Sequence, residues 1–279
     1  MKFLFKHRYL LLRRFVQTGV LVCFVLGNYS GLKLLRGDYS SSLLLDTVPL
    51  SDPFAFLQLL AAGGAISADV LIGAASVFFL YALIGGRVFC SWVCPMNIVT
   101  DLAGFLRVWA GFERLKQNLL FSRNIRYYVI VLALILSSVF GILAYEAISP
   151  LGVLHRSVIF GMGFGFTLVL GVFLFDLLAL KNGFCGHICP LGGFYAVFSR
   201  FSLLRIKYES EKCTHCMRCK EICPEKQVLD AVGKAQDGTV SSGECTRCGR
   251  CIEVCNDNAI SFSITSFIKK DKKYENNID

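Results

Sequence analysis

Charged residues are scarce over most of this chain. Only 18% of its 279 residues are charged, whereas 54% are hydrophobic. Such a balance excludes an ordinary soluble protein and points to membrane spans. The scarcity is uneven, because residues 1–206 carry few charges while 207–279 are polar and charged. The composition therefore predicts a membrane part followed by a soluble part.

Four stretches carry no charge over about the length that a bilayer requires, ~17–25 residues. They are Phe15–Leu32, Val70–Gly86, Tyr127–Tyr145 and Ser157–Phe175. No small-x-small cleavage site follows the first stretch, which argues against a removed signal peptide. A buried helix of a soluble protein would explain any one stretch. Four in one chain predict an α-helical membrane domain with four transmembrane helices over residues 1–206.

Lysine and arginine are unevenly distributed between the connections of these spans. They gather before the first span and between the second and third, whereas the first connection is acidic and the last has only Arg156. Because basic loops stay on the cytoplasmic side, we expect a multi-pass protein of the bacterial inner membrane with both termini inside. The connections at 33–69 and 146–156 are expected outside. The net charge of +9 comes mostly from the basic loops, so it calls for no nucleic-acid partner.

Against this background the chain has 13 cysteines, eight of them in two runs in the polar part. The runs are Cys213-x2-Cys216-x2-Cys219-x3-Cys223-Pro224 and Cys245-x2-Cys248-x2-Cys251-x3-Cys255. This is the ligand spacing of a two-cluster bacterial ferredoxin, in which each run binds one [4Fe–4S] cluster with three cysteines and lends the fourth to the other cluster. The spacing predicts a small α+β ferredoxin-like domain over 207–265, and the charge pattern predicts that this domain is cytoplasmic. It assigns Cys213, Cys216, Cys219 and Cys255 to one cluster, and Cys245, Cys248, Cys251 and Cys223 to the other. A charged tail at 266–279 is expected to be disordered.

Zinc competes for such cysteine sets, since four thiolates bind it tetrahedrally. Zinc ribbons pair two separate C-x2-C knuckles, however, and two complete four-cysteine runs favour iron–sulfur clusters. Asn256 follows the second run where Pro224 follows the first, but that proline shapes a turn and is not a ligand. Cys23 stands alone in the first span, where we expect a small apolar filler.

Four further cysteines form two copies of Cys-x3-Cys-Pro, one after the second span and one after the fourth. The copies are Phe89-Cys90-Ser-Trp-Val-Cys94-Pro95 and Phe184-Cys185-Gly-His-Ile-Cys189-Pro190. Proline disfavours a helical residue before it and suits the first position of a helix, so we expect a break at the second cysteine of each copy and an interfacial helix after it. The membrane domain then consists of two repeated hairpins that hold four thiols at one depth. A third metal centre shared by all four thiols, a pair of redox dithiols, and simple packing of small side chains all remain open.

Four spans, two Cys-x3-Cys-Pro motifs and a C-terminal two-cluster domain together resemble the NapH-type quinol dehydrogenases, which are membrane components of periplasmic nitrate reductase systems. The segment Gly37–Pro53 resembles the first external loop of that family, and Arg87–Pro95 and Cys185–Pro190 resemble its cysteine motifs. The resemblance implies that electrons leave membrane quinol and pass, through a periplasmic iron–sulfur partner of the NapG type, toward nitrate reductase. NosR-type regulators and CcoG/RdxA-type assembly factors share the core. A copper-handling maturation factor that acts through the Cys-x3-Cys-Pro thiols is therefore the alternative.

Quinol oxidation releases two electrons and two protons, so a proton acceptor is needed near the quinol. Candidate side chains are His155, Arg156, His187, Glu146 and Asp176. The last lies within the fourth span, where a carboxylate is costly and is therefore a candidate functional group. Each of the five also has a purely structural explanation, and the sequence identifies no catalytic residue. Nor does it explain how electrons move between cytoplasmic clusters and an external reductase.

Overall fold

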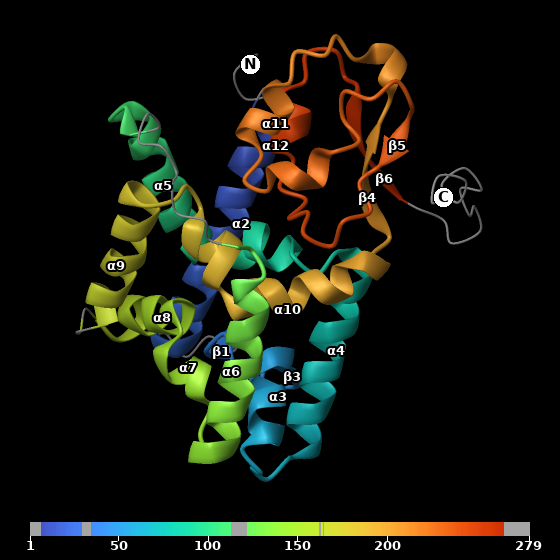
Figure 1. The fold of residues 1–279 in the computed structure, drawn as a ribbon. Helices are drawn as coiled ribbons and strands as arrows, with labels where there is room; N and C mark the ends of the chain where they lie inside the picture. The colour runs from blue at the N-terminus through green and yellow to red at the C-terminus, as the bar shows by residue number, and fades with distance from the viewer. Residues whose placement is uncertain (1–6, 30–34, 113–121, 162, 164, 265–279) are drawn as a thin grey trace.

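The structure is a computed structural model, and it describes residues 7–29, 35–112, 122–161, 163 and 165–264. Figure 1 shows long helices below a cap of strands and short helices that is formed by the C-terminal part of the chain. The predicted tail at 266–279 lies outside the described residues, and so does part of the basic connection between the second and third spans.

One described helix is long and apolar enough to cross a bilayer by itself. It is α2 (Arg8–Tyr29), with 22 residues. Three shorter apolar helices are α4 (Ala68–Ile84), α6 (Ile125–Phe140) and α9 (Gly165–Leu178). At ~1.5 Å per residue, α4 extends about 25 Å, slightly less than the ~30 Å hydrocarbon core of a bilayer.

The helices observed at the predicted third and fourth spans have different bounds. Helix α6 ends at Phe140, because Gly141 takes a left-handed C-cap conformation with φ 64°. The chain then forms the short helix α7 (Ala144–Ile148). The predicted span Ser157–Phe175 covers the end of α8 (Pro150–Phe160) and most of α9. It therefore does not correspond to one continuous helix.

The predicted external connection folds into a sheet and a helix. The elements are β1 (Leu35–Gly37), β2 (Ser41–Leu44), β3 (Val48–Ser51) and α3 (Pro53–Ala61), and the three strands form an antiparallel sheet in sequence order. Asp52 begins α3, because its carboxylate accepts the Ala55 N–H (3.1 Å). Gly73 of α4 allows the sheet to approach, since a Cβ there would lie 3.0 Å from the carbonyl oxygen of Pro49.

Both Cys-x3-Cys-Pro motifs fold as a π-helical turn, an extended cysteine and a new helix. The first copy comprises η1 (Phe89–Val93), Cys94 and α5 (Met96–Trp109); the second comprises η3 (Phe184–Ile188), Cys189 and α10 (Pro190–Phe198). The predicted break at each second cysteine is confirmed, since both have extended backbone angles. The two halves interlock, because α5 of the first half packs against α9 of the second, and α10 of the second half contacts α4 of the first (Figure 1).

The C-terminal cap is a second antiparallel sheet with short helices. Its strands are β4 (Leu204–Tyr208), β5 (Gly238–Thr239) and β6 (Ile260–Ile264), with β4 in the centre. Its helices are η4 (Ser199–Phe201), η5 (Ser210–Lys212), α11 (Arg218–Ile222), η6 (Lys226–Leu229) and α12 (Arg250–Val254). Buried Ile206 and Tyr208 of β4 pack with Leu229, Val232 and the cysteines of both runs. This core holds α11 and α12 side by side.

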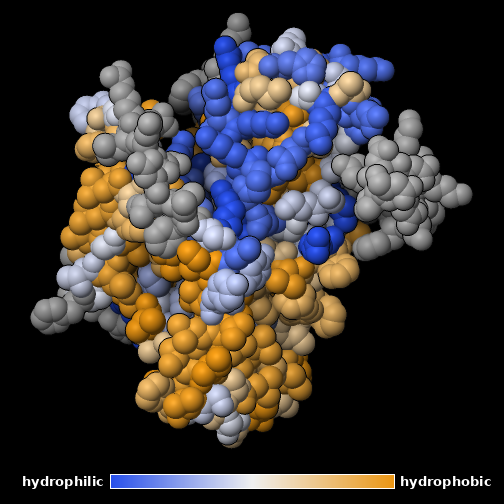
Figure 2. Space-filling view, viewed as in Figure 1, coloured by the Kyte–Doolittle hydropathy of each residue, from blue (hydrophilic) through white to orange (hydrophobic). Residues whose placement is uncertain are grey.

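The polarity of the surface changes at the boundary between the long helices and the C-terminal cap. Figure 2 shows hydrophobic side chains over the lower helices and hydrophilic ones over the C-terminal cap. Large apolar side chains are exposed on several helices, for example Phe79 of α4, Trp109 of α5 and Tyr128 of α6. Apolar patches on soluble monomers are usually limited to a few hundred Å², so this surface is unlike that of a soluble monomer.

Candidate iron–sulfur sites

Four cysteines from the two runs surround a cavity in the C-terminal cap. They are Cys213, Cys216, Cys219 and Cys255, and the cavity contains about 340 Å³ free of protein atoms. The backbone is left-handed at His215 and Met217, with φ 56° and 57°. The His215 N–H points at the Cys213 sulfur (3.4 Å). We call this the outer site, because Cys216 is exposed.

A second cavity of about 340 Å³ is lined by Cys245, Cys248, Cys251 and Cys223. Its loop repeats the first one, since Arg247 and Gly249 are left-handed (φ 51° and 76°) at the same distances after the first cysteine of the run. Each cavity takes three cysteines from one run and the fourth from the other, as in ferredoxins with crossed ligands. We call this the inner site, because its three cysteines from the second run are buried.

Buried hydrogen bonds fix the loop of the inner site to the helical part. Arg247 is only 3% exposed and donates to the Ser199 hydroxyl (2.6 Å). Its side chain passes beside Gly85, where a Cβ would lie 2.7 Å from the Arg247 side chain. The Ser91 hydroxyl of the first motif donates to the carbonyl oxygen of Thr246 (2.7 Å). The loop and the first motif are therefore in direct contact.

Ion pairs also connect the C-terminal cap to the helical part. Arg87 and Glu225 form a buried ion pair (2.7 Å), with side chains that are 2% and 3% exposed. Arg87 also donates to the carbonyl oxygen of Glu244 (2.8 Å). Arg123 pairs with Glu225, and Arg126 pairs with Glu244. A buried pair fixes its partners, because separating them leaves an uncompensated charge.

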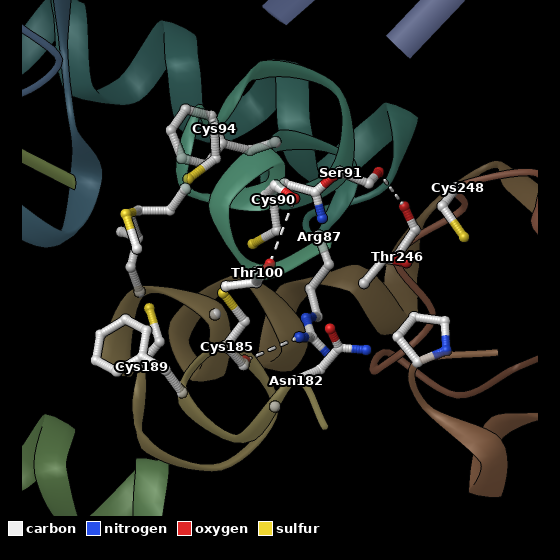
Figure 3. A pocket seen from close by; sticks show the side chains of 18 of the residues that line it. Arg87, Cys90, Ser91, Cys94, Thr100, Asn182, Cys185, Cys189, Thr246 and Cys248 are labelled. Atoms are coloured by element: carbon white, nitrogen blue, oxygen red, sulfur yellow. Dashed lines mark hydrogen bonds between the residues drawn. The ribbon is translucent and has the colours of Figure 1, made fainter. Parts of the chain in front are cut away.

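The four remaining motif cysteines face one cavity between the two halves of the helical part (Figure 3). They are Cys90, Cys94, Cys185 and Cys189, and the cavity contains about 770 Å³ free of protein atoms. In each π-helical turn the N–H of the second cysteine bonds to the carbonyl oxygen five residues earlier (2.9 Å). This wider turn brings two cysteines spaced by four residues to the same side of the chain. We call this the membrane site.

The thiols of the membrane site raise one another's pKa values. Burial raises the pKa of Cys90 to about 11, with Arg87 opposing the rise and Cys189 adding to it. Burial and the neighbouring Cys189 also raise the pKa of Cys185. These groups are therefore neutral thiols at pH 7, and a metal centre would stabilise their thiolate forms instead. Among the described residues, no three His, Cys, Asp or Glu side chains are grouped as ligands of a single metal ion.

The cavity of the membrane site touches two other parts of the chain. Cys248 of the inner site and the neighbouring Thr246 contribute to its wall, and so do Tyr145 and Leu151. The Tyr145 hydroxyl lies 3.7 Å from the Cys189 sulfur. Tyr145 closes the predicted third span, and Leu151 belongs to the connection expected outside. The cavity that holds the four thiols is therefore lined both by the C-terminal cap and by a segment predicted to lie toward the other face of the membrane.

The longer connection expected outside also approaches the motifs. Tyr195 of α10 donates to the Asp52 carboxylate (3.2 Å), and the Tyr39 hydroxyl donates to the Val93 carbonyl oxygen of η1 (3.4 Å). Burial raises the pKa of Asp52 to about 7, and nearby Glu146 adds to the rise. Asp52 therefore changes its protonation near neutral pH, and sequence analysis did not single it out.

The five predicted proton acceptors do not form one group. His155 is fully buried between the rings of Phe24 and Tyr39, and neither of its ring nitrogens has a hydrogen-bond partner in the described part of the chain. Arg156 donates to the backbone carbonyl oxygen of Glu146 (3.2 Å), which links these two residues in the same region. Burial raises the pKa of Glu146.

The other two candidates lie around the second motif. Asp176 is buried and accepts the Phe184 N–H (2.9 Å), so it caps the turn η3. His187 is a buried residue of η3 itself. Sequence analysis missed the buried arginines of the sites, such as Arg13 and Arg87, because a positive charge beside a span is equally well explained by membrane orientation.

Comparison with known proteins identifies the family. Residues 205–256 match a family described as a 4Fe-4S dicluster domain, and residues 68–113 and 161–209 match one described as a 4Fe-4S binding domain. The ferredoxin-type proteins NapH of Haemophilus influenzae and of Escherichia coli are each 46% identical over 226 residues, 81% of this chain and 78% of theirs. The chain belongs to the family of NapH ferredoxin-type proteins.

Membership of this family confirms the resemblance and the predicted cofactors. The dicluster match makes the chain a ferredoxin-type iron–sulfur electron-transfer protein with two [4Fe–4S] clusters. The methylamine utilization ferredoxin-type protein MauN of Methylorubrum extorquens is also similar, with 40% identity over 84% of this chain and 81% of its own. No solved structure matches the chain.

Proposed function

We propose that this protein takes electrons from membrane quinol and passes them toward a periplasmic nitrate reductase, with a periplasmic iron–sulfur partner of the NapG type. One observation carries the proposal: Cys248 lines both the inner site and the cavity of the membrane site. Metal centres in the inner and membrane sites would therefore be neighbours across Cys248. Such proximity suits a relay that moves one electron at a time.

In this proposal the helical part (1–206) has four spans, and the two-cluster domain (207–265) and charged tail (266–279) lie in the cytoplasm. The apolar surface below the C-terminal cap supports it (Figure 2). Three of the helices are short for a span, but α4 is continued by the loop at Gly85 and by η1. The re-entrant segments around Asp52 and Tyr145 fill the space between the helices.

We assign the ligands as the two cavities of the cap group them. Cys213, Cys216, Cys219 and Cys255 hold the outer cluster, and Cys245, Cys248, Cys251 and Cys223 hold the inner one. Cys90, Cys94, Cys185 and Cys189 hold a third metal centre in the membrane site, for which we propose a further [4Fe–4S] cluster. The converging sulfurs of Figure 3 and the 4Fe-4S binding family that matches both motif segments support this choice over two separate dithiols.

Such clusters carry one electron each, so a quinol that yields two electrons needs more than one of them. The chain must also accept two protons. Asp52, with a pKa of about 7, accepts one near neutral pH, and Glu146, whose pKa is raised by burial, is the nearest second acceptor. The contact between Tyr145 and Cys189 would link this region to the membrane site. The electron route is then short, because the cavity of the four thiols is lined both by the C-terminal cap and by Tyr145 and Leu151.

Two other functions are favoured by particular observations. The MauN proteins of methylamine utilization, at 39–41% identity, support a related electron path that serves methylamine utilization. The four buried thiols also suit Cu(I), which prefers thiolate ligands, so a copper-handling assembly factor is the alternative.

Iron counting and quinol reduction test the proposal in the full-length protein purified anaerobically in detergent. We expect about twelve irons per chain if three cubanes are bound, and about eight in a Cys90→Ala/Cys185→Ala variant. Added quinol should reduce the clusters, as followed by their EPR signals. Eight irons in both proteins would refute the third cluster. Clusters that quinol leaves oxidised, with the periplasmic partner present, would refute the quinol function, and thiol-dependent copper binding would support the alternative.

A further inference from the structure

Arg87 is a buried arginine that lies between the two Cys-x3-Cys-Pro motifs. It stands three residues before Cys90 of the first motif, and its Nη2 donates to the Cys185 carbonyl oxygen of the second (3.3 Å; Figure 3). Its guanidinium also interacts electrostatically with the Cys90 thiolate. A single side chain therefore reaches both halves of the membrane site.

One donor of this side chain is unused. Arg87 is 2% exposed, and its Nε has no acceptor in the described part of the chain. Its Nη1 donates to the Glu225 carboxylate (2.7 Å) and to the Glu244 carbonyl oxygen (2.8 Å), which hold the guanidinium from the side of the cap. Arg87 also lines the cavity that the four motif cysteines face. Because a buried N–H donor without a partner is costly, we expect its acceptor to lie in that cavity.

Arg123 shows that binding the cap does not by itself require this position. It pairs with the other oxygen of the same Glu225 carboxylate. Its side chain is 28% exposed, however, and it lines none of the three cavities described above. Both arginines thus bind the cap, whereas only Arg87 also lines the membrane site.

We propose that the free Nε–H of Arg87 donates to a sulfur atom of the metal centre in the membrane site, and that this contact makes the centre easier to reduce. The proposal rests on the third metal centre proposed above. Reduction adds one negative charge to a cluster that four thiolates already make anionic, and a cation with N–H donors stabilises that form. The membrane site then accepts an electron from quinol more readily.

An EPR-monitored redox titration of the full-length protein, purified anaerobically in detergent, tests this assignment. The signal of the membrane site is the one that Cys90→Ala/Cys185→Ala lacks. In Arg87→Met we expect its reduction equilibrium to shift at least tenfold toward the oxidised form, which is about 59 mV for one electron. Arg123→Met is the matched control, because it removes an arginine that pairs with the same carboxylate but does not line the cavity; the potential of the membrane site should stay unchanged.

If Arg87→Met loses iron, Arg87→Lys replaces it, since lysine keeps the charge but not the Nε donor; we expect a smaller shift in the same direction. An unchanged potential of the membrane site in an Arg87 variant with full iron content would overturn the proposal, and so would an equal shift in Arg123→Met. A protein with about eight irons and no signal from the membrane site would instead refute the third cluster, and this proposal with it. Reduction of the remaining clusters by quinol tests the electron path separately.

Discussion

The ion pair between Arg87 and Glu225 offers a quantitative test of how the ferredoxin domain is held against the membrane helices. In Arg87→Met, Glu225 stays buried and keeps only Arg123 as a charged partner. Removing one partner of a buried pair costs about 3–5 kcal/mol, and we expect about 3 because Arg123 remains. At about 1.4 kcal/mol per tenfold change, the population of the undocked state rises roughly 100-fold.

Hydrogen–deuterium exchange measures this opening at the interface. The Leu10 N–H of α2 donates to the Glu253 carboxylate of α12 (2.9 Å), so its exchange rate reports on contact between the two parts. Arg36→Met is the control, because Arg36 is 52% exposed and its pair with Asp46 spans 3.8 Å; such surface pairs contribute about 1 kcal/mol or less. An Arg87→Met variant whose Leu10 exchange rises less than about threefold, below about 0.7 kcal/mol, would refute the reasoning.

Three further predictions concern single residues. Folding raises the pKa of Asp52 from 3.8 to about 7, so the folded state binds more protons and its stability falls as pH rises between these values; in Asp52→Asn the melting temperature should vary less over that range. Gly86→Ala places a Cβ 2.2 Å from the Tyr195 carbonyl oxygen, and thermal melts should show a clear loss of stability, whereas Gly19→Ala, with nothing within 4 Å, should be neutral. Cys23→Ala should leave the iron content unchanged, because Cys23 lines none of the three cavities; any loss of iron would show that the cysteine is more than an apolar filler.

Local sequence signals predicted much of the fold. Proline after each second motif cysteine predicted the breaks at Cys94 and Cys189, because proline restricts the residue before it whatever the tertiary context. The ends of the third and fourth apolar stretches were not predictable in the same way. Gly141 ends α6 through a left-handed backbone angle, and Ser149 starts α8 by accepting the Gly152 N–H. Neither effect changes the hydropathy of the stretch.

The candidate sites were likewise predictable only where local sequence signals determine them. The grouping of the ferredoxin cysteines around two cavities was predictable, because three cysteines of each group lie within one short run. The connection between the inner and membrane sites was not, since it depends on contacts such as that of Ser91 with Thr246, 155 residues apart in sequence. The approach of Tyr39 and Asp52 to the motif regions was equally hidden, because the charge pattern predicts the side of the membrane on which a loop lies and not which segments it packs against.

The first turn of α2 is completed by the other end of the fold. The backbone N–H groups of Tyr9 and Leu10 both donate to the carboxylate of Glu253 in α12 (2.6 and 2.9 Å), more than 240 positions later. During translation this helix is synthesised long before its acceptor. Its uncapped donors can be satisfied by the protein only after the iron-binding loops have been made. Glu253 lies between Cys251 and Cys255, so we expect a chain that fails to load iron in this run to leave the start of α2 without its acceptor as well.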